Sequence, residues 1–379
     1  MQFDDKIVGF GLTFDDVLLI PRYSEITPDM VTLKTRLSRN LNINVPLMSA
    51  AMDTVTEHEM AIALAENGGV GVIHKNMSIE AQAAEIKMVK DTVVSQEEYP
   101  NAILDKNGKL LVGASIGIKA EKLERAKALA EAGVDFLILD SAHGNSKNVV
   151  EALKELKKNF PTIDIIAGNV ATYEGAKRLA ENGADAIKVG MGPGSICTTR
   201  VISGMGVPQI TAIMECAKAC KEHNIPLIAD GGIRYSGDIV KAIVAGADSV
   251  MLGAIFGATS EAPGNTVIIN GKKYKQYRGM GSLAAMAQAN GSSDRYFQDP
   301  HKKLVAEGVE ALVPCKGSAS DIIFELLGGL RSGMGYEGAK DLETLQKEAK
   351  FLRITSASLK ESHPHDVTLE KESSNYWRP

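Results

Sequence analysis

Residues 182–200 read NGADAIKVGMGPGSICTTR, and this stretch contains the pattern that decides the fold. Gly183 closes a helix-like segment, an apolar run follows at Ala186–Val189, and the chain then breaks into glycines. Glycine just after a helix is typical of a left-handed helix end. A helix end, a short strand and a glycine-rich break are the parts of a strand–helix unit of an α/β protein.

The same unit recurs along the chain from Val45 onward. Similar helix ends occur as Ala-Gly-Val-Asp at 132–135 and Ala-Gly-Ala-Asp at 245–248. The apolar runs that we interpret as strands are Val45–Ala50, Gly69–Ile73, Leu110–Ala114, Val134–Leu139, Ile163–Ala167, Ala186–Val189, Ile225–Ala229 and Ser249–Leu252. Helical segments between them include Ala120–Ala132, Ser146–Asn159, Tyr173–Asn182 and Gly237–Ala245. Eight such units predict an α/β fold with a closed (β/α)8 TIM barrel rather than an open doubly wound sheet.

Three segments depart from this repeat. Residues 90–100 are a polar connection between the second and third units. Residues 259–314 form an excursion after the eighth strand that is too long for a plain loop, which predicts a lid or flap. The polar C-terminal tail, Lys360–Pro379, contains a His-Pro-His sequence, which we interpret as surface rather than a metal site. We expect residues 1–379 to form one catalytic domain.

The composition limits the kind of partner. Of the 379 residues 44% are apolar, and the formal net charge is −5, which argues against nucleic acid or a membrane surface. An anionic small molecule remains compatible, because helix N-termini bind phosphate even in an acidic protein. Four cysteines are too few for a disulfide framework, and we find neither a signal-peptide pattern nor a bilayer-length apolar run. We therefore expect a cytoplasmic protein, with Cys216 and Cys220 as small buried side chains.

In a TIM barrel the chemistry lies at the carboxyl ends of the strands. Cys197 lies on the glycine-rich loop after one strand, where its thiol is exposed and Arg200 could favour the thiolate. The alternative is a turn that merely contains a small apolar cysteine. Glycines at 231–232 and Gly253 follow the last two strands and resemble a phosphate cradle, although they could also serve only to close turns.

Several motifs together match one family over nearly the whole chain. They are Leu12–Val17, Ala51–Thr56, Asp140–Gly144, Gly192–Thr199, Tyr277–Gly281 and Arg295-Tyr296. On these motifs the chain resembles the family of inosine-5′-monophosphate (IMP) dehydrogenase and guanosine-5′-monophosphate (GMP) reductase. The cysteine loop is common to both enzymes, whereas Arg295-Tyr296 and Asp140–Gly144 favour the dehydrogenase.

The resemblance implies a reaction in two stages. Cys197 attacks C2 of the purine ring of IMP, hydride passes to NAD, and hydrolysis releases xanthosine monophosphate. Arg295 is then the base that activates water, with Thr199 and Tyr296 beside it. An arginine base is unexpected because of its high pKa, and the residue types alone would assign Arg295 to phosphate or carboxylate binding.

The resemblance also implies the binding residues. For IMP these are Met52, Ser195, Asp230, Gly232, Gly253, Tyr277, Met280, Gly281 and Glu307, and for NAD they are Asp140, Ser141, Asn169 and Gly190. A monovalent cation, usually potassium, takes carbonyls of Gly192, Gly194 and Cys197, completed by a neighbouring subunit at positions like Glu361, Ser362 and His363. The implied assembly is a homotetramer.

Two features differ from most of the family. Members commonly insert a regulatory pair of cystathionine-β-synthase-like repeats where this chain has only residues 90–100, so either the chain is naturally short or the module was removed. Ala254 stands where a phosphate-binding serine is common, which predicts a loss of about 1 kcal/mol in IMP binding. The competing interpretations are GMP reductase, which uses NADPH, and a nucleotide-binding barrel without catalysis.

Overall fold

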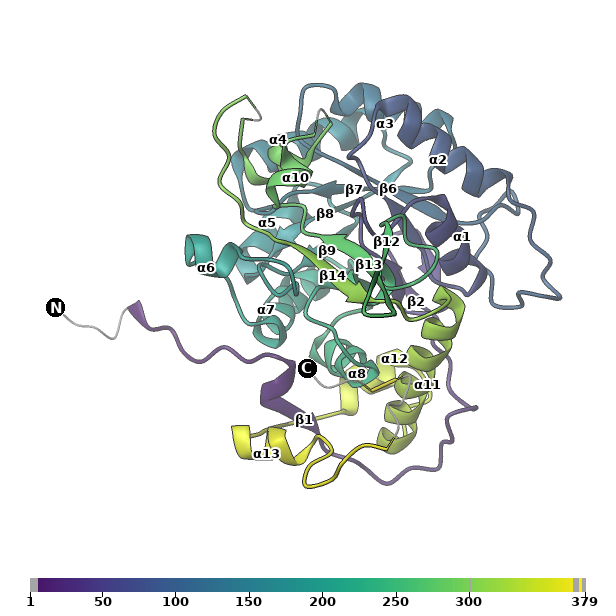
Figure 1. The fold of residues 1–379 in the computed structure, drawn as a ribbon, viewed down its shortest axis with the longest axis vertical. Helices are drawn as coiled ribbons and strands as arrows, with labels where there is room; N and C mark the ends of the chain where they lie inside the picture. Colours follow the sequence, from purple (N-terminus) through teal and green to yellow (C-terminus); the bar gives the residue numbers. More distant parts are fainter. Residues whose placement is uncertain (1–5, 289, 300, 371–374, 377–379) are drawn as a thin grey trace.

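The computed structural model describes residues 6–288, 290–299, 301–370 and 375–376. Eight parallel strands form its centre (Figure 1). They are β4 (Leu47–Ser49), β5 (Gly71–Ile73), β6 (Val112–Ile116), β7 (Phe136–Asp140), β8 (Asp164–Val170), β9 (Ala186–Val189), β10 (Leu227–Asp230) and β11 (Ser249–Leu252). Their order is β4-β11-β10-β9-β8-β7-β6-β5. Val70 joins the two ends of this order, because its N–H donates to Leu47 and its carbonyl accepts from Ser49. The predicted closed barrel is confirmed.

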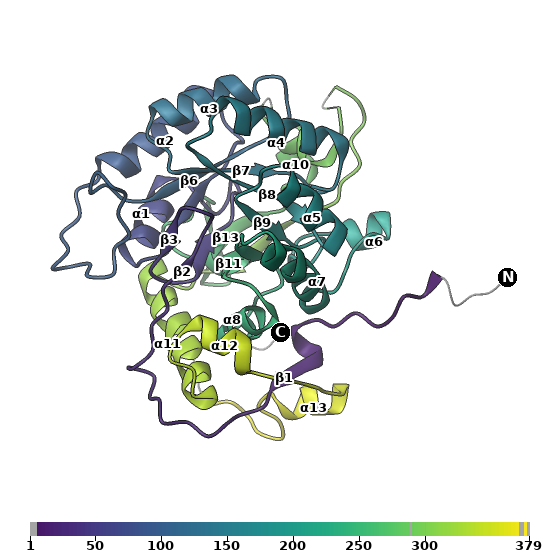
Figure 2. The ribbon, with the colours of Figure 1, turned by 180° about the vertical axis from the view of Figure 1, so that it is seen from behind.

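Helices surround the barrel, as the two opposite views show (Figures 1 and 2). They are α1 (His58–Glu66), α2 (Ile79–Asp91), α3 (Lys122–Glu131), α4 (Lys147–Asn159), α5 (Tyr173–Glu181), α7 (Gln209–Glu222), α8 (Ser236–Ala245) and α11 (Ala319–Glu337). A further helix, α12 (Leu342–Glu348), packs on α8 and α11. The four predicted helical segments correspond to α3, α4, α5 and α8. Side chains cap several N-termini: Thr172, for example, accepts from the N–H of Gly175 at the start of α5. Gly246 ends α8 with φ +119°, the left-handed conformation that the Ala-Gly-Ala-Asp sequence predicted.

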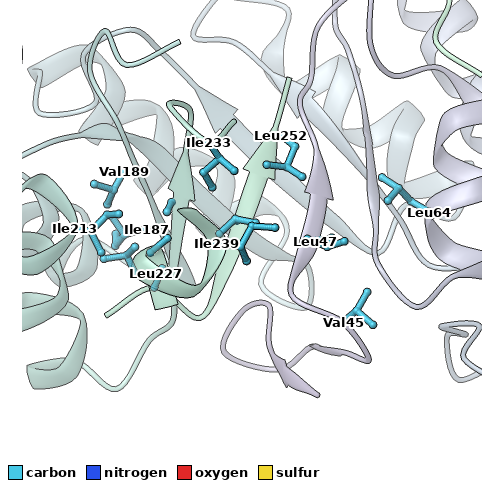
Figure 3. Close-up of a cluster of buried hydrophobic side chains, with 14 of the residues drawn as sticks. Val45, Leu47, Leu64, Ile187, Val189, Ile213, Leu227, Ile233, Ile239 and Leu252 are labelled. Carbon is cyan, nitrogen blue, oxygen red and sulfur yellow. The ribbon is translucent and has the colours of Figure 1, made fainter. Parts of the chain in front are cut away.

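The core has two layers because side chains on a strand alternate between its faces. One buried cluster fills the barrel interior and includes Met48, Ile138, Ile166, Ala186, Ile228 and Met251. A second lies between the barrel and the helices, where Leu47 lies toward Leu64 of α1 and Leu227 toward Ile239 of α8 (Figure 3). The barrel is therefore a packed core, with space for a ligand only at its ends.

The excursion after β11 is a folded structure. Its stem is the antiparallel sheet of β12 (Thr266–Ile269), β13 (Lys272–Arg278) and β14 (Glu310–Pro314). Between β13 and β14 lie α10 (Leu283–Met286) and a 3-10 helix at Ser292–Tyr296. We call residues 279–309 the flap.

The remaining elements lie outside the barrel. β1 (Val17–Leu19) follows a 3-10 helix at Phe14–Asp16 and pairs with β15 (Phe351–Arg353), which joins the two ends of the chain. β2 (Thr35–Arg36) pairs with β3 (Asn42–Ile43), and α13 (Ser356–Glu361) begins the tail. The polar connection after α2 is held by Lys90, whose Nζ lies 2.9 Å from Asp105 and 2.6 Å from Asp135. Within the described ranges, no helix is both long and apolar enough to cross a bilayer.

Candidate active site

A cavity of about 1890 Å³ opens at the carboxyl ends of the barrel strands. Most of the predicted site residues line it. They are Met52, Asp140, Asn169, Gly190, Gly192, Gly194, Ser195, Cys197, Asp230, Gly232, Gly253, Tyr277, Met280, Gly281, Arg295, Tyr296 and Glu307. The barrel closure thus brings residues from six strand ends and the flap around one space.

The other predicted residues lie elsewhere. Thr199 is behind the cysteine, with its Oγ1 3.2 Å from the Cys197 sulfur. Ser141 is buried, and its hydroxyl accepts from the N–H of His143. Glu361 and Ser362 end α13, away from the cavity lining, and the His363 ring packs against Tyr235. Among the described tail residues, Glu361, Ser362 and His363 therefore do not line the cavity within one chain, although Tyr376 of the same tail does.

The cysteine loop connects β9 to α6 (Thr199–Ser203). Gly190 has φ +153°, and a Cβ there would collide with the carbonyl oxygen of Asp230, so only glycine fits. The Arg200 guanidinium spans the loop and donates to the carbonyls of Met191 at 3.1 Å and Val207 at 2.7 Å. Arg200 thus acts chiefly on the backbone of the loop, a role that the sequence analysis did not foresee.

The returning end of the flap is hydrogen-bonded to the cysteine loop. The N–H of Thr198 donates to the Glu307 carbonyl at 2.9 Å, and the N–H of Val309 donates to the Ile196 carbonyl at 3.0 Å. Glu307 in turn donates its N–H to Gly281. This short ladder holds Glu307 and Gly281 beside Cys197.

Lys188 lies at the centre of the polar floor of the cavity, and the sequence analysis assigned it no role. Its side chain is 3% exposed, and Nζ lies 2.6 Å from Asp230 and 3.0 Å from Asp140. It also donates to Asn169, whose amide donates to Asp230 at 2.9 Å. The available signal was a charged residue inside an apolar strand at the position facing the barrel interior, where an ammonium needs a charged partner.

The flap brings Arg295 and Tyr296 over this floor. The Arg295 guanidinium forms an ion pair with Asp140, and the N–H of Ala142 donates to the Arg295 carbonyl at 3.0 Å. Tyr296 packs so closely on Gly281 that a Cβ there would lie 2.7 Å from its ring. Burial raises the pKa of Tyr296, which keeps the phenol protonated.

The predicted phosphate end lies between β10, β11 and the flap stem. Gly232 has φ +83°, and Gly253 precedes α9 (Ala254–Gly257). The buried Tyr277 hydroxyl lies 4.0 Å from the Met52 sulfur and leaves no space for a Cβ at Gly253. Burial raises the pKa of Tyr277, so its hydroxyl remains a donor for an anion.

A bidentate ion pair that the sequence analysis missed fixes the stem. Arg278 Nε and Nη2 lie 3.1 Å and 2.7 Å from the two oxygens of Asp53. Asp53 follows Met52, so this pair holds the start of the flap against the residue predicted to pack on the purine.

Comparison with known proteins agrees with this geometry. The family model described as "IMP dehydrogenase / GMP reductase domain" matches residues 11–365. The chain belongs to this family. Proteins named inosine-5′-monophosphate dehydrogenase are similar to it from end to end. That of Aquifex aeolicus is 44% identical, over 98% of this chain and 99% of the relative. Those of Borreliella burgdorferi and Cryptosporidium parvum are each 50% identical, over 96% and 98% of this chain and 98% and 99% of the relative.

The lengths of these alignments differ. The alignment with the Aquifex aeolicus protein extends over 485 positions, over a hundred more than the 379 residues of this chain. The alignment with the Borreliella burgdorferi protein extends over only 400. Relatives therefore occur both with and without about a hundred additional internal residues.

Proposed function

We propose that the chain is an NAD-dependent IMP dehydrogenase, which oxidises IMP to xanthosine monophosphate for guanine nucleotide synthesis. The observation that carries the proposal is that Cys197 and the flap residue Arg295 line the same cavity. A nucleophile for a covalent step and a group for hydrolysis are thereby within reach of one substrate. The names of the full-length relatives support the same reaction.

The floor of the cavity fits the two ribose groups that this reaction requires. Asp140 and Asp230 present carboxylate oxygens on either side of Lys188, and carboxylates accept hydrogen bonds from ribose hydroxyls. We assign Asp230 to IMP, because it adjoins the phosphate end, and Asp140 to NAD, with Ser141, Asn169 and Gly190 nearby. Arg295 pairs with Asp140 in this structure, so the flap and the dinucleotide compete for one carboxylate.

The first stage begins at Cys197. Its sulfur forms a bond to C2 of IMP, and the electron pair of the C2–H bond leaves as hydride. NAD, when bound, accepts that hydride. Met52, Met280, Gly281 and Glu307 orient the purine, while Ser195, Gly232, Gly253 and Tyr277 hold the phosphate.

The second stage is hydrolysis with the flap over the site. Arg295 first loses a proton to solvent; in its neutral form it takes a proton from water, the water oxygen bonds to C2, and the C–S bond breaks with its electrons returning to Cys197. Asp140 stabilises the guanidinium that this transfer produces. Thr199 and the protonated Tyr296 are the nearby hydroxyl groups. The overall reaction consumes IMP, NAD and water and yields xanthosine monophosphate, NADH and a proton.

GMP reductase is the second member of the family description, and the flap argues against it. Reduction of GMP includes no hydrolysis and therefore requires no Arg-Tyr pair. In this chain the Arg295 and Tyr296 side chains both line the cavity that contains Cys197. A binding barrel without catalysis is disfavoured by the same two residues.

We further propose a potassium site and a homotetramer. Loop carbonyls of Gly192, Gly194 and Cys197 suit a hard cation, and the tail of a second copy would add Glu361, Ser362 and His363. Val201 and Met205 beside this loop are 85% and 63% exposed in one chain, which supports an interface there.

The chain is proposed to be one catalytic domain, with residues 90–100 in place of the regulatory module and 259–314 as the flap and its stem. A cytoplasmic location is supported by the cysteines, because all four are free.

The test is NADH absorbance after mixing the protein with IMP, NAD and potassium, with Cys197→Ala as the control. NADH that forms only with Cys197 supports the proposal. Oxidation of NADPH in the presence of GMP would instead identify the chain as a GMP reductase. Binding of IMP without turnover would support the non-catalytic barrel.

A further inference from the structure

A buried ion pair anchors the flap immediately before Arg295. Lys75 Nζ lies 2.5 Å from Asp294 Oδ1, and both side chains are 7% exposed. Lys75 follows β5 at the carboxyl end of the barrel, whereas Asp294 lies in the 3-10 helix of the flap, 219 residues later. Neither residue has a part in the proposed chemistry, and the sequence analysis assigned neither a role.

The side chains around this pair are mostly basic, which suits a carboxylate. Lys119, Lys122 and Arg125 line the same small hollow as Lys75, with Glu121 as the acidic neighbour that pairs with Arg125. Gly117 directly follows β6, and a Cβ there would collide with the Asp294 carboxylate. The hollow is therefore basic, and it has room for the Asp294 side chain only because residue 117 is glycine.

Asp294 offsets part of the cost of burying the Lys75 ammonium. Burial lowers the pKa of Lys75, and the charges of Lys119 and Arg295 lower it further, whereas Asp294 raises it. When the flap leaves, the ammonium loses the carboxylate that offsets this burial. Removal of one partner from a buried ion pair leaves an uncompensated buried charge, so a change at either residue is expected to destabilise the closed flap.

Asp294 directly precedes Arg295, the residue that we propose activates water. The carbonyl of Arg295 accepts from Ala142, and its guanidinium pairs with Asp140, so two consecutive flap residues hold the flap at three points. The guanidinium contact uses Asp140 of the proposed dinucleotide site, and the Ala142 contact lies beside Ser141 of the same site. Only the Lys75 contact lies outside it and can act without competing with the dinucleotide.

We propose that Lys75 is a positioning residue for hydrolysis, which latches the flap through Asp294 so that Arg295 lies in the active site. This inference rests on the proposed function for its kinetic consequence but not for the latch itself. The matched variants are Asp294→Asn, which keeps the shape of the side chain, and Lys75→Met. The control is Asp299→Asn on the same flap, because Asp299 faces Lys302 at 3.8 Å and both are largely exposed.

The first measurement is hydrogen–deuterium exchange in the protein without substrates. Loss of a buried hydrogen bond to a charged group is expected to raise exchange of residues 292–297 and of the Ala142 N–H roughly tenfold to a hundredfold. The double variant is expected to match the single variants, because the two residues act through one contact. If exchange of these residues in Asp294→Asn and Lys75→Met equals that in Asp299→Asn, the proposed latch is refuted. If Lys75→Met does not fold, the test rests on Asp294→Asn alone, because Asp294 lies in the flap and not in the barrel.

The second measurement separates the two stages of the reaction. An unlatched flap leaves hydride transfer intact but slows hydrolysis, so a rapid burst of NADH is expected before a kcat about tenfold lower. The apparent Kd for NAD is expected to fall, because the flap competes less for Asp140. Equal loss of burst and steady-state rates would indicate a merely structural pair and refute the proposal. Absence of NADH from the parent protein would refute the proposed function, while exchange would still decide the latch.

Discussion

Replacement of Lys188 by methionine is the most informative perturbation of the floor of the site. Lys188 is buried and holds Asp140 and Asp230 on either side. Methionine fills a similar volume but removes the ammonium. Two carboxylates then face one buried space, where Asp230 keeps the Asn169 amide and Asp140 keeps Arg295.

The size of the effect follows from the burial of these partners. A hydrogen bond to a charged group contributes about 1.5–3 kcal/mol, and leaving a buried charge unpaired costs about 3–5 kcal/mol. Asp230 is 18% exposed and Asp140 still pairs with Arg295. The cost of the unpaired charge is therefore at the lower end of the range of about 3–5 kcal/mol. We expect the free energy of unfolding to fall by about 3 kcal/mol. The KM for IMP is expected to rise about tenfold, because Asp230 is no longer held toward the ribose.

The assays are denaturant unfolding and IMP titration at pH 5 and pH 8. The deficit in stability is expected to be smaller at pH 5, because the folded variant gains a proton that relieves carboxylate repulsion, and this gain is lost as the pH rises. Lys157→Met is the matched control. Lys157 Nζ lies 2.7 Å from Asp185, and neither residue lines the cavity. Unchanged stability and IMP affinity in Lys188→Met would refute the charge argument.

Three further predictions concern other parts of the molecule. Burial raises the pKa of Asp248 from 3.8 to about 6, so its ionisation destabilises the fold increasingly over that interval. Asp248→Asn is expected to raise the free energy of unfolding by about 2 kcal/mol at pH 8 and by less than about 1 kcal/mol at pH 4, as measured by denaturant titration. Tyr277→Phe removes a donor at the phosphate end, and steady-state kinetics are expected to give a KM for IMP raised about fivefold with kcat nearly unchanged. Val201→Glu places a charge on the proposed interface, and light scattering is expected to show a smaller oligomer, with an unchanged tetramer contradicting the assignment.

Most of the barrel could be predicted from local patterns. The Ala186–Val189 run is β9 without a shift, and Ser249–Leu252 is β11. Other strand ends moved by about two residues, because an apolar run continues into the turn beside it. The excursion at 259–314 was predicted to be long and functional, but its antiparallel stem was not, since three short segments become a sheet only by pairing with one another.

For the site, sequence motifs located the residues but not their contacts. The strand-end positions of Asp140, Cys197 and Asp230 predicted one shared cavity, and the structure places them there. Arg200 was expected to act on the thiol, yet its donors reach the carbonyls of Met191 and Val207. A side chain this long can reach several partners from one position, and only the path of the loop selects among them.

The sequence alone determined the repeating strand–helix unit, the family, and the cysteine and Arg-Tyr motifs, because each is written in neighbouring residues. Only the tertiary structure decided that Lys188 neutralises two carboxylates and that Lys75 holds Asp294 across 219 residues. Alternation along a strand predicts which face a side chain takes, but not which side chain meets it there. That choice depends on the register of the closed barrel and on the path of the flap over it, which no local pattern specifies.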